Sequence, residues 1–454
     1  MNKILQSDKA SFASILRDTL RIAEKYVSND QETLPAGMLV DDLPLETLPE
    51  KGLGAMEVLK RFETRHSKFI TNSAGPRYFG FVTGGSTPAS VAGDWLVSTY
   101  DQNACGSNDS IAPQIERQAI DFIRQLLGID KDFFGSFVTG ATMSNMVGLA
   151  QGRQWVGEQQ GFDFSNDGIS GKVKVISGTP HSTILKSLAM IGVGRKNVVF
   201  AKTLNDREAV DLNDLEQHLK NNPHPIVVAN AGTVNTVDFD DLVAIGKLKE
   251  KYSFWLHVDA AFGGFAGASP KYSHLTKGIN YADSICVDAH KWLNVPYDAA
   301  MQFTRHKNIQ LKIFQNSGAA YLSDPQQSTD FFHYTPETSR RFRALPAWFS
   351  LMAYGREGHS EIVERNCAMA SKLGAWLEQS DKFRLLAPVR MNVVCFTLAS
   401  GEVKPFLDRI RIDGRAYFTP TVYKGTPAIR AAVSNWLTTE SDIDITIQAL
   451  EQLA

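Results

Sequence analysis

The sequence predicts an α/β fold, with a large domain built on a mostly parallel, seven-stranded sheet and a smaller C-terminal α+β domain. Two observations support this prediction. Between about residues 115 and 305, helical segments alternate with short apolar runs, the pattern of parallel strands joined by helices. Several of these runs are continuously apolar or β-branched rather than alternating, as expected for strands that are covered on both faces.

Each predicted strand is short and rich in β-branched or aromatic residues. The seven strands are expected at residues 137–139, 173–177, 198–201, 226–230, 255–260, 284–287 and 301–304. Helical periodicity separates them at 113–127, 143–158, 182–191, 211–220 and 240–251. Beyond residue 345, helices are expected at 348–355 and 361–378, strands at 393–397 and 428–433, and a last helix from about Ser441.

The N-terminal part differs from the rest of the chain. Residues 10–27 carry apolar side chains at helical spacing, and a second helix is plausible at 51–70. The Pro- and Asp-rich residues 35–49 between them indicate an extended connection. This part has too few apolar residues for a core of its own, so we expect it to pack on another surface. The expected divisions are therefore 1–70, 71–345 and 346–454.

The composition argues against several classes of function. The formal net charge is −2 and no stretch is strongly basic, which disfavours a nucleic-acid partner. The N-terminus is charged every few residues and no run of roughly 18 apolar residues occurs, so neither a signal peptide nor a membrane span is predicted. Four cysteines without a CxxC pair are typical of reduced thiols in a cytoplasmic protein, and no metal site is predicted.

The first chemical signal is an aspartate at the end of an apolar run, Asp259 in FWLHVDAAF (254–262). An ionised carboxylate in such a strand is costly unless a cation or a donor group meets it. Open α/β sheets bind ligands at the carboxyl ends of their strands. Asp259 could therefore hold a cationic ring nitrogen, although capping the next turn or pairing with an arginine would also explain it.

The second signal is a lysine after the next apolar run, Lys291 in DSICVDAHKWL (283–293). Trp292 and Leu293 beside it suggest partial desolvation, which would disfavour the ammonium form and make the amine available for imine chemistry. Alternatively, the lysine lies on the surface with its head in water. His290 could equally be a hydrogen-bonded structural histidine.

Two further signals are turns between a strand and a helix. FVTGATMSN (137–145) resembles a phosphate site, because free backbone N–H groups and the helix dipole attract anions, but it matches neither a Walker A nor a GxGxxG fingerprint. His181, in SGTPHST (177–183), could stack on a planar ring. Capping of the following helix by Ser182 or Thr183 explains that turn equally well.

With these residues in this order, the chain from about residue 70 resembles the group II pyridoxal-5′-phosphate (PLP)-dependent amino-acid decarboxylases, relatives of the aromatic-L-amino-acid and glutamate decarboxylases. The resemblance is carried by GATMSNM (140–146), HVDAAFGG (257–264), DAHKWL (288–293) and SRRFRALPAWF (339–349). RYFGF (77–81), Pro88 and DWL (94–96) are similar to the family's substrate-side segment. The resemblance implies the aspartate-aminotransferase fold (fold type I), a PLP cofactor, release of CO₂ and an amine, and a homodimer with the site at the subunit interface.

The resemblance also implies catalytic roles for four residues. Lys291 matches the lysine that binds PLP as a Schiff base, and Asp259 matches the carboxylate that keeps the pyridine nitrogen protonated. His181 matches the histidine that stacks on the ring. Tyr321 resembles the loop tyrosine that protonates the substrate Cα after CO₂ leaves.

The remaining implied contacts are to the cofactor. Cofactor-binding residues are expected to be Ala141, Thr142, Met143, His181, Asn230, Asp259, Ala261, Asp288, His290 and Lys291. Three of these depart from the usual family pattern: Asp288 stands where Asn is common, Asn230 where Thr is common, and Met143 where a hydroxyl residue is common. Met143 therefore leaves that phosphate contact to backbone N–H groups.

The substrate is open at this level. Phe79, Phe81 and Trp95 could line an aromatic pocket or belong to the core, and Arg77 and Arg340 could bind a side-chain carboxylate or pair with structural acids. The sequence favours an aromatic amino acid, with an acidic one as the alternative. The stretch 321–340 is shorter than in animal aromatic decarboxylases, so the chain could instead be another PLP-dependent carbon–carbon lyase or an aldehyde synthase. The remaining alternative is a non-catalytic module that binds PLP.

Overall fold

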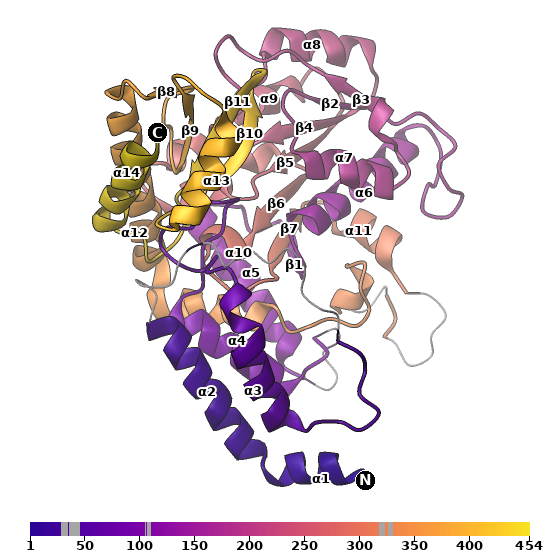
Figure 1. The fold of residues 1–454 in the computed structure, drawn as a ribbon. Coiled ribbons are helices and arrows are strands. Elements are labelled where there is room, and N and C mark those ends of the chain that lie inside the picture. Colours follow the sequence, from indigo (N-terminus) through magenta and orange to yellow (C-terminus); the bar gives the residue numbers. More distant parts are fainter. Residues whose placement is uncertain (29–34, 36–45, 105, 107–109, 317–322, 326–329) are drawn as a thin grey trace.

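The computed structural model describes residues 1–28, 35, 46–104, 106, 110–316, 323–325 and 330–454 of the 454-residue chain. Its centre is a seven-stranded sheet with helices on its faces (Figure 1). The strands are β1 (Phe134–Val138), β2 (Val175–Ser177), β3 (Val198–Phe200), β4 (Ile226–Asn230), β5 (Trp255–Asp259), β6 (Ser284–Asp288) and β7 (Ala300–Thr304). Every strand predicted for this sheet is present.

The sheet has the order β1-β7-β6-β5-β4-β2-β3. Only β7 is antiparallel to its neighbours, β1 and β6, so the sheet is mostly parallel as predicted. β4, β5 and β6 are buried along their whole length, which explains their continuously apolar sequences. β1 begins at Phe134, before the predicted start, because its pairing with β7 extends from Val138 back to Phe134.

The predicted helices between these strands are also present, with boundaries shifted by a few residues. They are α5 (Ala112–Leu127), α6 (Ala141–Gln159), α7 (Ser182–Met190), α8 (Leu212–Asn221) and α9 (Leu242–Leu248), joined by α4 (Pro88–Tyr100), α10 (Ala289–Trp292) and α11 (Lys307–Phe314). Short 3-10 helices are η1 (Ser67–Phe69), η2 (Arg195–Asn197), η3 (Gly263–Ala268), η4 (Ser273–Thr276), η5 (Ile279–Tyr281) and η6 (Phe331–His333).

The C-terminal part forms a second, antiparallel sheet of order β10-β11-β9-β8. It contains α12 (Ala344–Glu378), β8 (Phe383–Leu385), β9 (Val393–Leu398), α13 (Val403–Asp413), β10 (Thr419–Tyr423), β11 (Thr426–Ala432) and α14 (Glu440–Leu453). The smaller α+β unit is thus confirmed. α12 is interrupted at Gly355, whose φ of 58° and ψ of −167° suit glycine, and this separates the two helices predicted there.

A segment from early in the chain is held by this second sheet. The Phe79 N–H donates to the Tyr417 carbonyl at 2.9 Å, and the Ala432 N–H donates to the Phe79 carbonyl at 3.0 Å. The rings of Tyr78 and Tyr417 stack with centroids 4.6 Å apart. These contacts fix the path of the segment, so that two residues further on the Phe81 carbonyl accepts a hydrogen bond from Arg430 Nη2 of β11.

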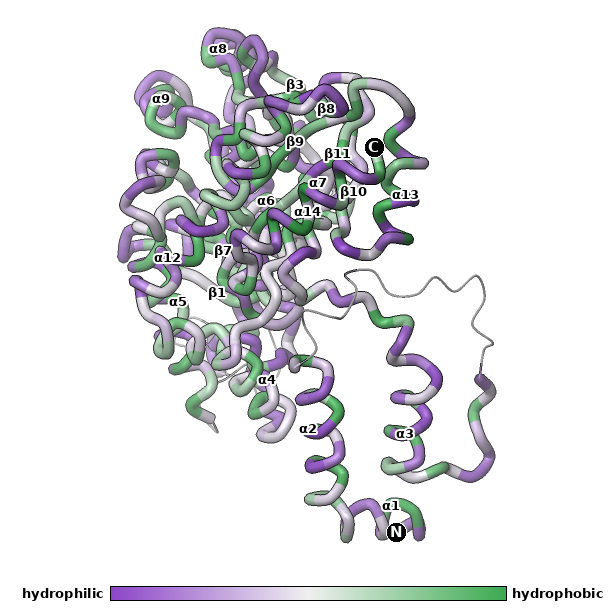
Figure 2. Tube along the Cα trace, turned by 60° about the vertical axis from the view of Figure 1, so that its left-hand side comes forward, coloured by the Kyte–Doolittle hydropathy of each residue, from purple (hydrophilic) through white to green (hydrophobic). Residues whose placement is uncertain are grey.

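The N-terminal helices α1 (Lys3–Ala10), α2 (Phe12–Ser28) and α3 (Ala55–Arg65) project away from the body of the molecule (Figures 1 and 2). None of the three contains a buried residue. Large apolar side chains such as Phe12, Leu16 and Phe62 are about half exposed or more. Within this single chain, these three helices therefore form no core of their own.

A buried histidine in α12 predicts how stability depends on pH. Burial lowers the pKa of His359 to about 4, whereas an unfolded chain binds this proton with an ordinary pKa of 6.5. Between these values the unfolded state holds more protons, so the free energy of unfolding falls as the pH drops from about 6.5 to 4, by on the order of 3 kcal/mol from this residue. We expect His359→Gln to flatten the fall in melting temperature between pH 7 and 4.5. Parallel curves for variant and wild type would contradict this assignment.

Candidate active site

A pocket of about 240 Å³ lies at the carboxyl ends of β4, β5 and β6. It brings together six of the residues predicted for the site: Ala141, His181, Asn230, Asp259, Ala261 and Lys291. Its other lining residues are Phe81, Val82, Thr179, Gly232, Val234, Phe262 and Arg430. The lining does not include Thr142, Met143, Asp288 or His290, each of which is within three positions along the chain of Ala141 or Lys291.

Asp259 ends β5 and is only 6% exposed. Its Oδ2 accepts a hydrogen bond from Asn145 Nδ2 at 3.1 Å, and its Oδ1 accepts one from the Ala261 N–H at 3.2 Å. Asn230, at the same level of the neighbouring strand β4, also lines the pocket. Asp259 is therefore held by donor groups, with no arginine as its partner in the part of the chain that the structure describes, and it remains available to a cationic ligand.

Lys291 lies in α10, directly after β6, and its side chain is 19% exposed. Its Nζ is 3.1 Å from Asp288 Oδ2. Burial lowers the pKa of Lys291, but the carboxylates of Asp288 and Asp259 raise it by more, so the net shift is upward. The prediction that desolvation would dominate this lysine is wrong, because its own helical turn supplies a counter-ion.

His181 lies at the turn where the sequence suggested either stacking of this histidine on a planar ring or capping of the next helix by Ser182 or Thr183; the structure makes His181 itself the cap. It lines the pocket, and it is also the N-cap residue of α7, since its Nδ1 accepts a hydrogen bond from the Thr183 N–H at 3.3 Å. Burial lowers the pKa of His181, and the nearby Asp259 carboxylate opposes that shift only in part. The ring is thus favoured in its neutral form, with Nδ1 as an acceptor.

The predicted phosphate turn forms the first turn of α6. Gly140 is its N-cap, in an extended conformation, and Ala141 faces the pocket. The Met143 side chain packs against the apolar cluster of Val138, Val147 and Ala300 instead. This supports the expectation that Met143 offers only its backbone N–H to an anion at the helix N-terminus.

Asp288 and His290 flank this region from β6 and α10. Asp288 Oδ1 is 3.4 Å from His290 Nε2, and the His290 ring stacks on Tyr297 with centroids 4.1 Å apart. His290 Nδ1 accepts a hydrogen bond from the Ala299 N–H at 3.2 Å. Burial lowers the pKa of His290, so its ring is also favoured as neutral.

Arg430 is the main residue that the sequence analysis missed. It lies in β11, and its Nη1 and Nη2 donate to the carbonyls of Val234 and Phe81. Its Nε is buried without a hydrogen-bond partner among the described residues. Burial lowers the pKa of Arg430 to about 10. An arginine inside the apolar run Ala428–Val433 is the same kind of signal that identified Asp259.

The two other arginines considered from the sequence are structural. Arg77 Nη1 donates to Asp442 at 2.8 Å, and Arg340 binds Glu116 through two hydrogen bonds of 2.8 and 3.1 Å. The aromatic residues also separate: Phe81 lines the pocket, Phe79 belongs to the core of the second sheet, and Trp95 is 44% exposed on α4. Tyr321 lies outside the described residues.

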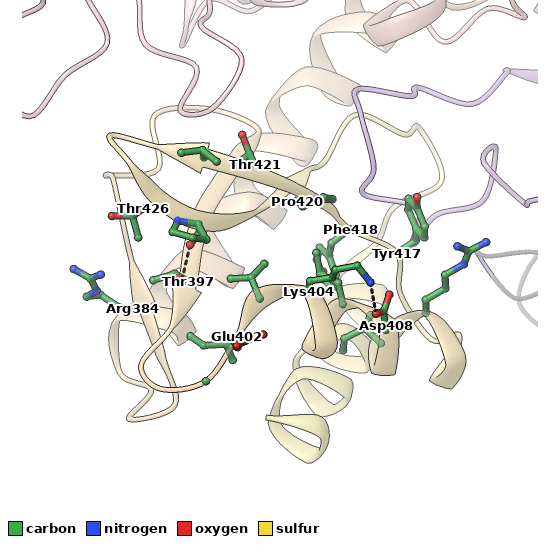
Figure 3. Close-up of a pocket in the computed structure, with 18 residues that line it drawn as sticks. Arg384, Thr397, Glu402, Lys404, Asp408, Tyr417, Phe418, Pro420, Thr421 and Thr426 are labelled. Atoms are coloured by element: carbon green, nitrogen blue, oxygen red, sulfur yellow. Dashed lines mark hydrogen bonds and ion pairs between the residues drawn. The ribbon is translucent and has the colours of Figure 1, made fainter.

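A larger pocket, of about 800 Å³, lies on the second sheet beside α13 (Figure 3). Its lining includes the ion pair between Lys404 and Asp408, whose Nζ and Oδ2 are 2.9 Å apart, but no histidine and no cysteine. Among the described residues, no group of three or more His, Cys, Asp or Glu could hold a metal ion. In the same part of the chain, no helix is long and apolar enough to cross a membrane.

The smaller pocket thus combines a lysine amine, a carboxylate held by donors, a neutral imidazole and a helix N-terminus within one parallel-sheet edge. This set fits PLP, because the cofactor has an aldehyde, a basic ring nitrogen, a flat ring and a phosphate. The fold and the site define a PLP-dependent enzyme of fold type I. Residues 39–399, most of the chain, match the family described as "Pyridoxal-dependent decarboxylase conserved domain", and the chain belongs to this family of PLP-dependent carboxy-lyases.

The chain is also similar to individual proteins over nearly its whole length. The chain is 26% identical over 443 residues to an aromatic-L-amino-acid decarboxylase of Bacillus atrophaeus, covering 93% of this chain and 90% of the relative. It is 24% identical to a 4-hydroxyphenylacetaldehyde synthase of Rhodiola rosea, with 93% and 90% covered. The structure of Oryza sativa TDC with PLP and tryptamine superposes with a TM-score of 0.89 at 22% identity, covering 98% and 99% of the two chains.

Proposed function

We propose that this enzyme converts an aromatic L-amino acid to its amine and CO₂, with PLP held through Lys291. The observation that carries the proposal is the convergence of Lys291, Asp259, His181 and Arg430 on one pocket. In this arrangement Asp259 would hold the ring nitrogen, His181 and Ala261 the two faces of the ring, and the first turn of α6 the phosphate. When bound, PLP supplies the electron sink for the bond that loses CO₂.

Lys291 needs to lose a proton before its amine can act as a nucleophile. Asp288 Oδ2, 3.1 Å from Nζ, is the carboxylate nearest to it and stabilises the ammonium form. We assign to Asp288 the task of stabilising Lys291 as an ammonium group whenever its amine is not bonded to the cofactor. Asn230, kept in place by Asp240, would contact the ring hydroxyl.

The pocket also favours an aromatic over an acidic substrate. Arg430 is the one guanidinium among the described lining residues, which suits a single carboxylate. Phe81, Phe262 and Val234 form apolar walls, whereas Arg77 and Arg340 are already paired with Asp442 and Glu116. A dicarboxylic amino acid would leave its second charge facing these apolar walls. The name of the Bacillus atrophaeus relative is in line with this choice.

A substrate panel tests the proposal. Purified protein with added PLP is offered L-tyrosine, L-tryptophan, L-phenylalanine and L-DOPA beside L-glutamate and L-aspartate, and CO₂ and amine are measured. We expect amine and CO₂ in equal amounts from at least one aromatic amino acid and none from the acidic ones. Release only from an acidic amino acid would overturn the substrate class, and aldehyde with ammonia in place of amine would indicate a synthase. The proton donor Tyr321 stays a prediction from the family resemblance.

We further propose that the protein is a cytoplasmic homodimer. Each chain would have three parts: residues 1–70, which cover the partner, the large domain 71–345 and the small domain 346–454. Supporting this, α1 to α3 bury none of their residues within one chain and expose Leu16 and Phe62.

Ultracentrifugation tests the dimer. We expect twice the 50.1 kDa mass of one chain, and at least about tenfold weaker association for the double variant Leu16→Asp, Phe62→Asp, because each change places a charge in the covered surface. The control Ile412→Asp changes a residue that is 75% exposed on α13 and should leave association unchanged. A wild-type protein with the mass of one chain would contradict the proposal.

A further inference from the structure

A buried asparagine joins three polar groups behind the pocket. Asn145 lies in α6, and its side chain is fully buried. Its Nδ2 donates to Asp259 Oδ2 at 3.1 Å and to Thr183 Oγ1 at 3.2 Å. Its Oδ1 accepts from His257 Nε2 at 2.9 Å. Both hydrogens and the oxygen of this amide are thus hydrogen-bonded. One hydrogen goes to the site residue Asp259, and the other goes to Thr183, which contacts the site residue His181.

The branch through His257 has a defined direction. Trp255 Nε1 can only donate, and it donates to Ser284 Oγ at 3.0 Å. The Ser284 hydroxyl hydrogen is then available to His257 Nδ1, 2.8 Å away, which leaves the ring proton on Nε2 facing Asn145. Burial lowers the pKa of His257 to about 4, so this ring is neutral at neutral pH. His257 therefore donates one hydrogen to the amide and carries no charge beside Asp259.

The second branch reaches the histidine on the pocket wall. Because Thr183 Oγ1 accepts from Asn145, its own hydroxyl hydrogen is available to His181 Nδ1, 2.7 Å away. This matches the role of His181 Nδ1 as the acceptor for the Thr183 N–H. The Asn145 amide thus orients the Asp259 carboxylate directly and the His181 imidazole through the Thr183 hydroxyl.

The helix carries two glycines that let this amide reach the sheet. Successive residues of β5 on one face, Trp255, His257 and Asp259, lie toward α6, which packs on β5 and β6. A Cβ at Gly148 would come within 2.7 Å of the His257 ring, and one at Gly152 within 2.9 Å of the Trp255 ring. Asn145, Gly148 and Gly152 share a helix face. Because the two glycines let α6 approach β5 closely, they also bring the Asn145 amide within reach of His257 and Asp259.

We propose that Asn145 is a positioning residue for the decarboxylation: its amide separates His257 from Asp259 and fixes the direction of both hydrogen-bond branches. Since the amide donates to Asp259 and accepts from His257, the amide and not the His257 imidazole contacts this carboxylate, which is left to pair with a cationic ring nitrogen. The same amide holds His181 in the tautomer with a free Nε2–H. This inference rests on the proposed function, because Asp259 acts in this way only with PLP bound.

Two variants of Asn145 test the inference in the full-length enzyme. Asn145→Ala removes all three hydrogen bonds, and the isosteric Asn145→Asp puts a carboxylate where Asp259 Oδ2 now receives an N–H. For both we expect PLP to bind roughly ten- to hundredfold more weakly, from equilibrium dialysis. We also expect kcat to fall by a similar factor while the KM for the amino acid changes less than about threefold, and the visible band of bound PLP to shift.

The matched control is Gln151→Ala. Gln151 is another fully buried amide of α6 and bonds to Val147 and Gln302, away from Asp259. It should lower the melting temperature as Asn145→Ala does, but leave PLP affinity, the visible spectrum and kcat unchanged. If the Asn145 variants change only the melting temperature, the inference is overturned while the proposed function stands. A wild-type enzyme that binds no PLP would overturn both.

Discussion

Replacing Lys291 with alanine is expected to reduce the release of CO₂ from the amino-acid substrate by roughly 10³-fold or more, to near the background rate. Lys291 Nζ is the one amine among the described residues that line the pocket, and no neighbouring side chain there could take over its role. The measurement is CO₂ release at saturating PLP. Borohydride reduction of the wild type should place the PLP mass on the peptide that contains Lys291.

The control for this experiment is Lys202→Ala. The Lys202 side chain is 81% exposed and lies near Asp214 on the surface, so its loss should leave both the rate and the PLP label unchanged. A PLP label on a lysine other than Lys291, or a Lys291→Ala variant with normal kcat, would contradict the whole assignment of the site.

The second large effect is expected on stability, from Arg340→Leu. The guanidinium binds Glu116 through two hydrogen bonds and also donates to the carbonyls of Ala104 and Phe137, and both charged side chains are 1% exposed. Without Arg340, the buried Glu116 carboxylate loses its ion-pair partner among the described residues, which costs about 3–5 kcal/mol of the free energy of unfolding. The check is the midpoint of urea unfolding.

Two further variants make this prediction specific. Arg341, the next residue, pairs with Asp94 at 2.8 Å with its side chain 35% exposed, so Arg341→Leu should cost only about 0–1 kcal/mol. The double variant Arg340→Leu, Glu116→Leu removes both charges and should recover a large part of the loss. Equal destabilisation by Arg340→Leu and Arg341→Leu would show that the buried ion pair contributes no more to stability than the surface pair, which would contradict the prediction.

The sequence was sufficient for the main sheet because its central strands β4 to β7 are buried along their whole length and read as apolar runs. It was insufficient where burial is partial. β10 alternates between buried and exposed residues and contains Pro420, and β8 has three residues, so neither has a clear apolar signal. Both are edge strands of the second sheet, where proline and short length are tolerated.

For the candidate site, residue types and order were predictable, but pairings were not. Arg340 and Glu116 are 224 positions apart, and Arg77 and Asp442 are 365 apart, so no local pattern reports these ion pairs. Arg430 could have been found, since a charge within an apolar strand was the argument used for Asp259. The pKa of Lys291 could also have been anticipated from Asp288, which is three residues away on the same turn.

The ion pair between Lys291 and Asp288 also bears on the chemical labelling of this protein. Since neighbouring carboxylates raise the pKa of Lys291, its amine in the absence of PLP is unprotonated at neutral pH less often than that of an ordinary surface lysine. Activated esters and other acylating probes should therefore modify surface lysines first and spare the one in the pocket. A covalent inhibitor for this site should not rely on the reactivity of the free lysine. It would gain selectivity from an anionic arm that engages the Arg430 guanidinium.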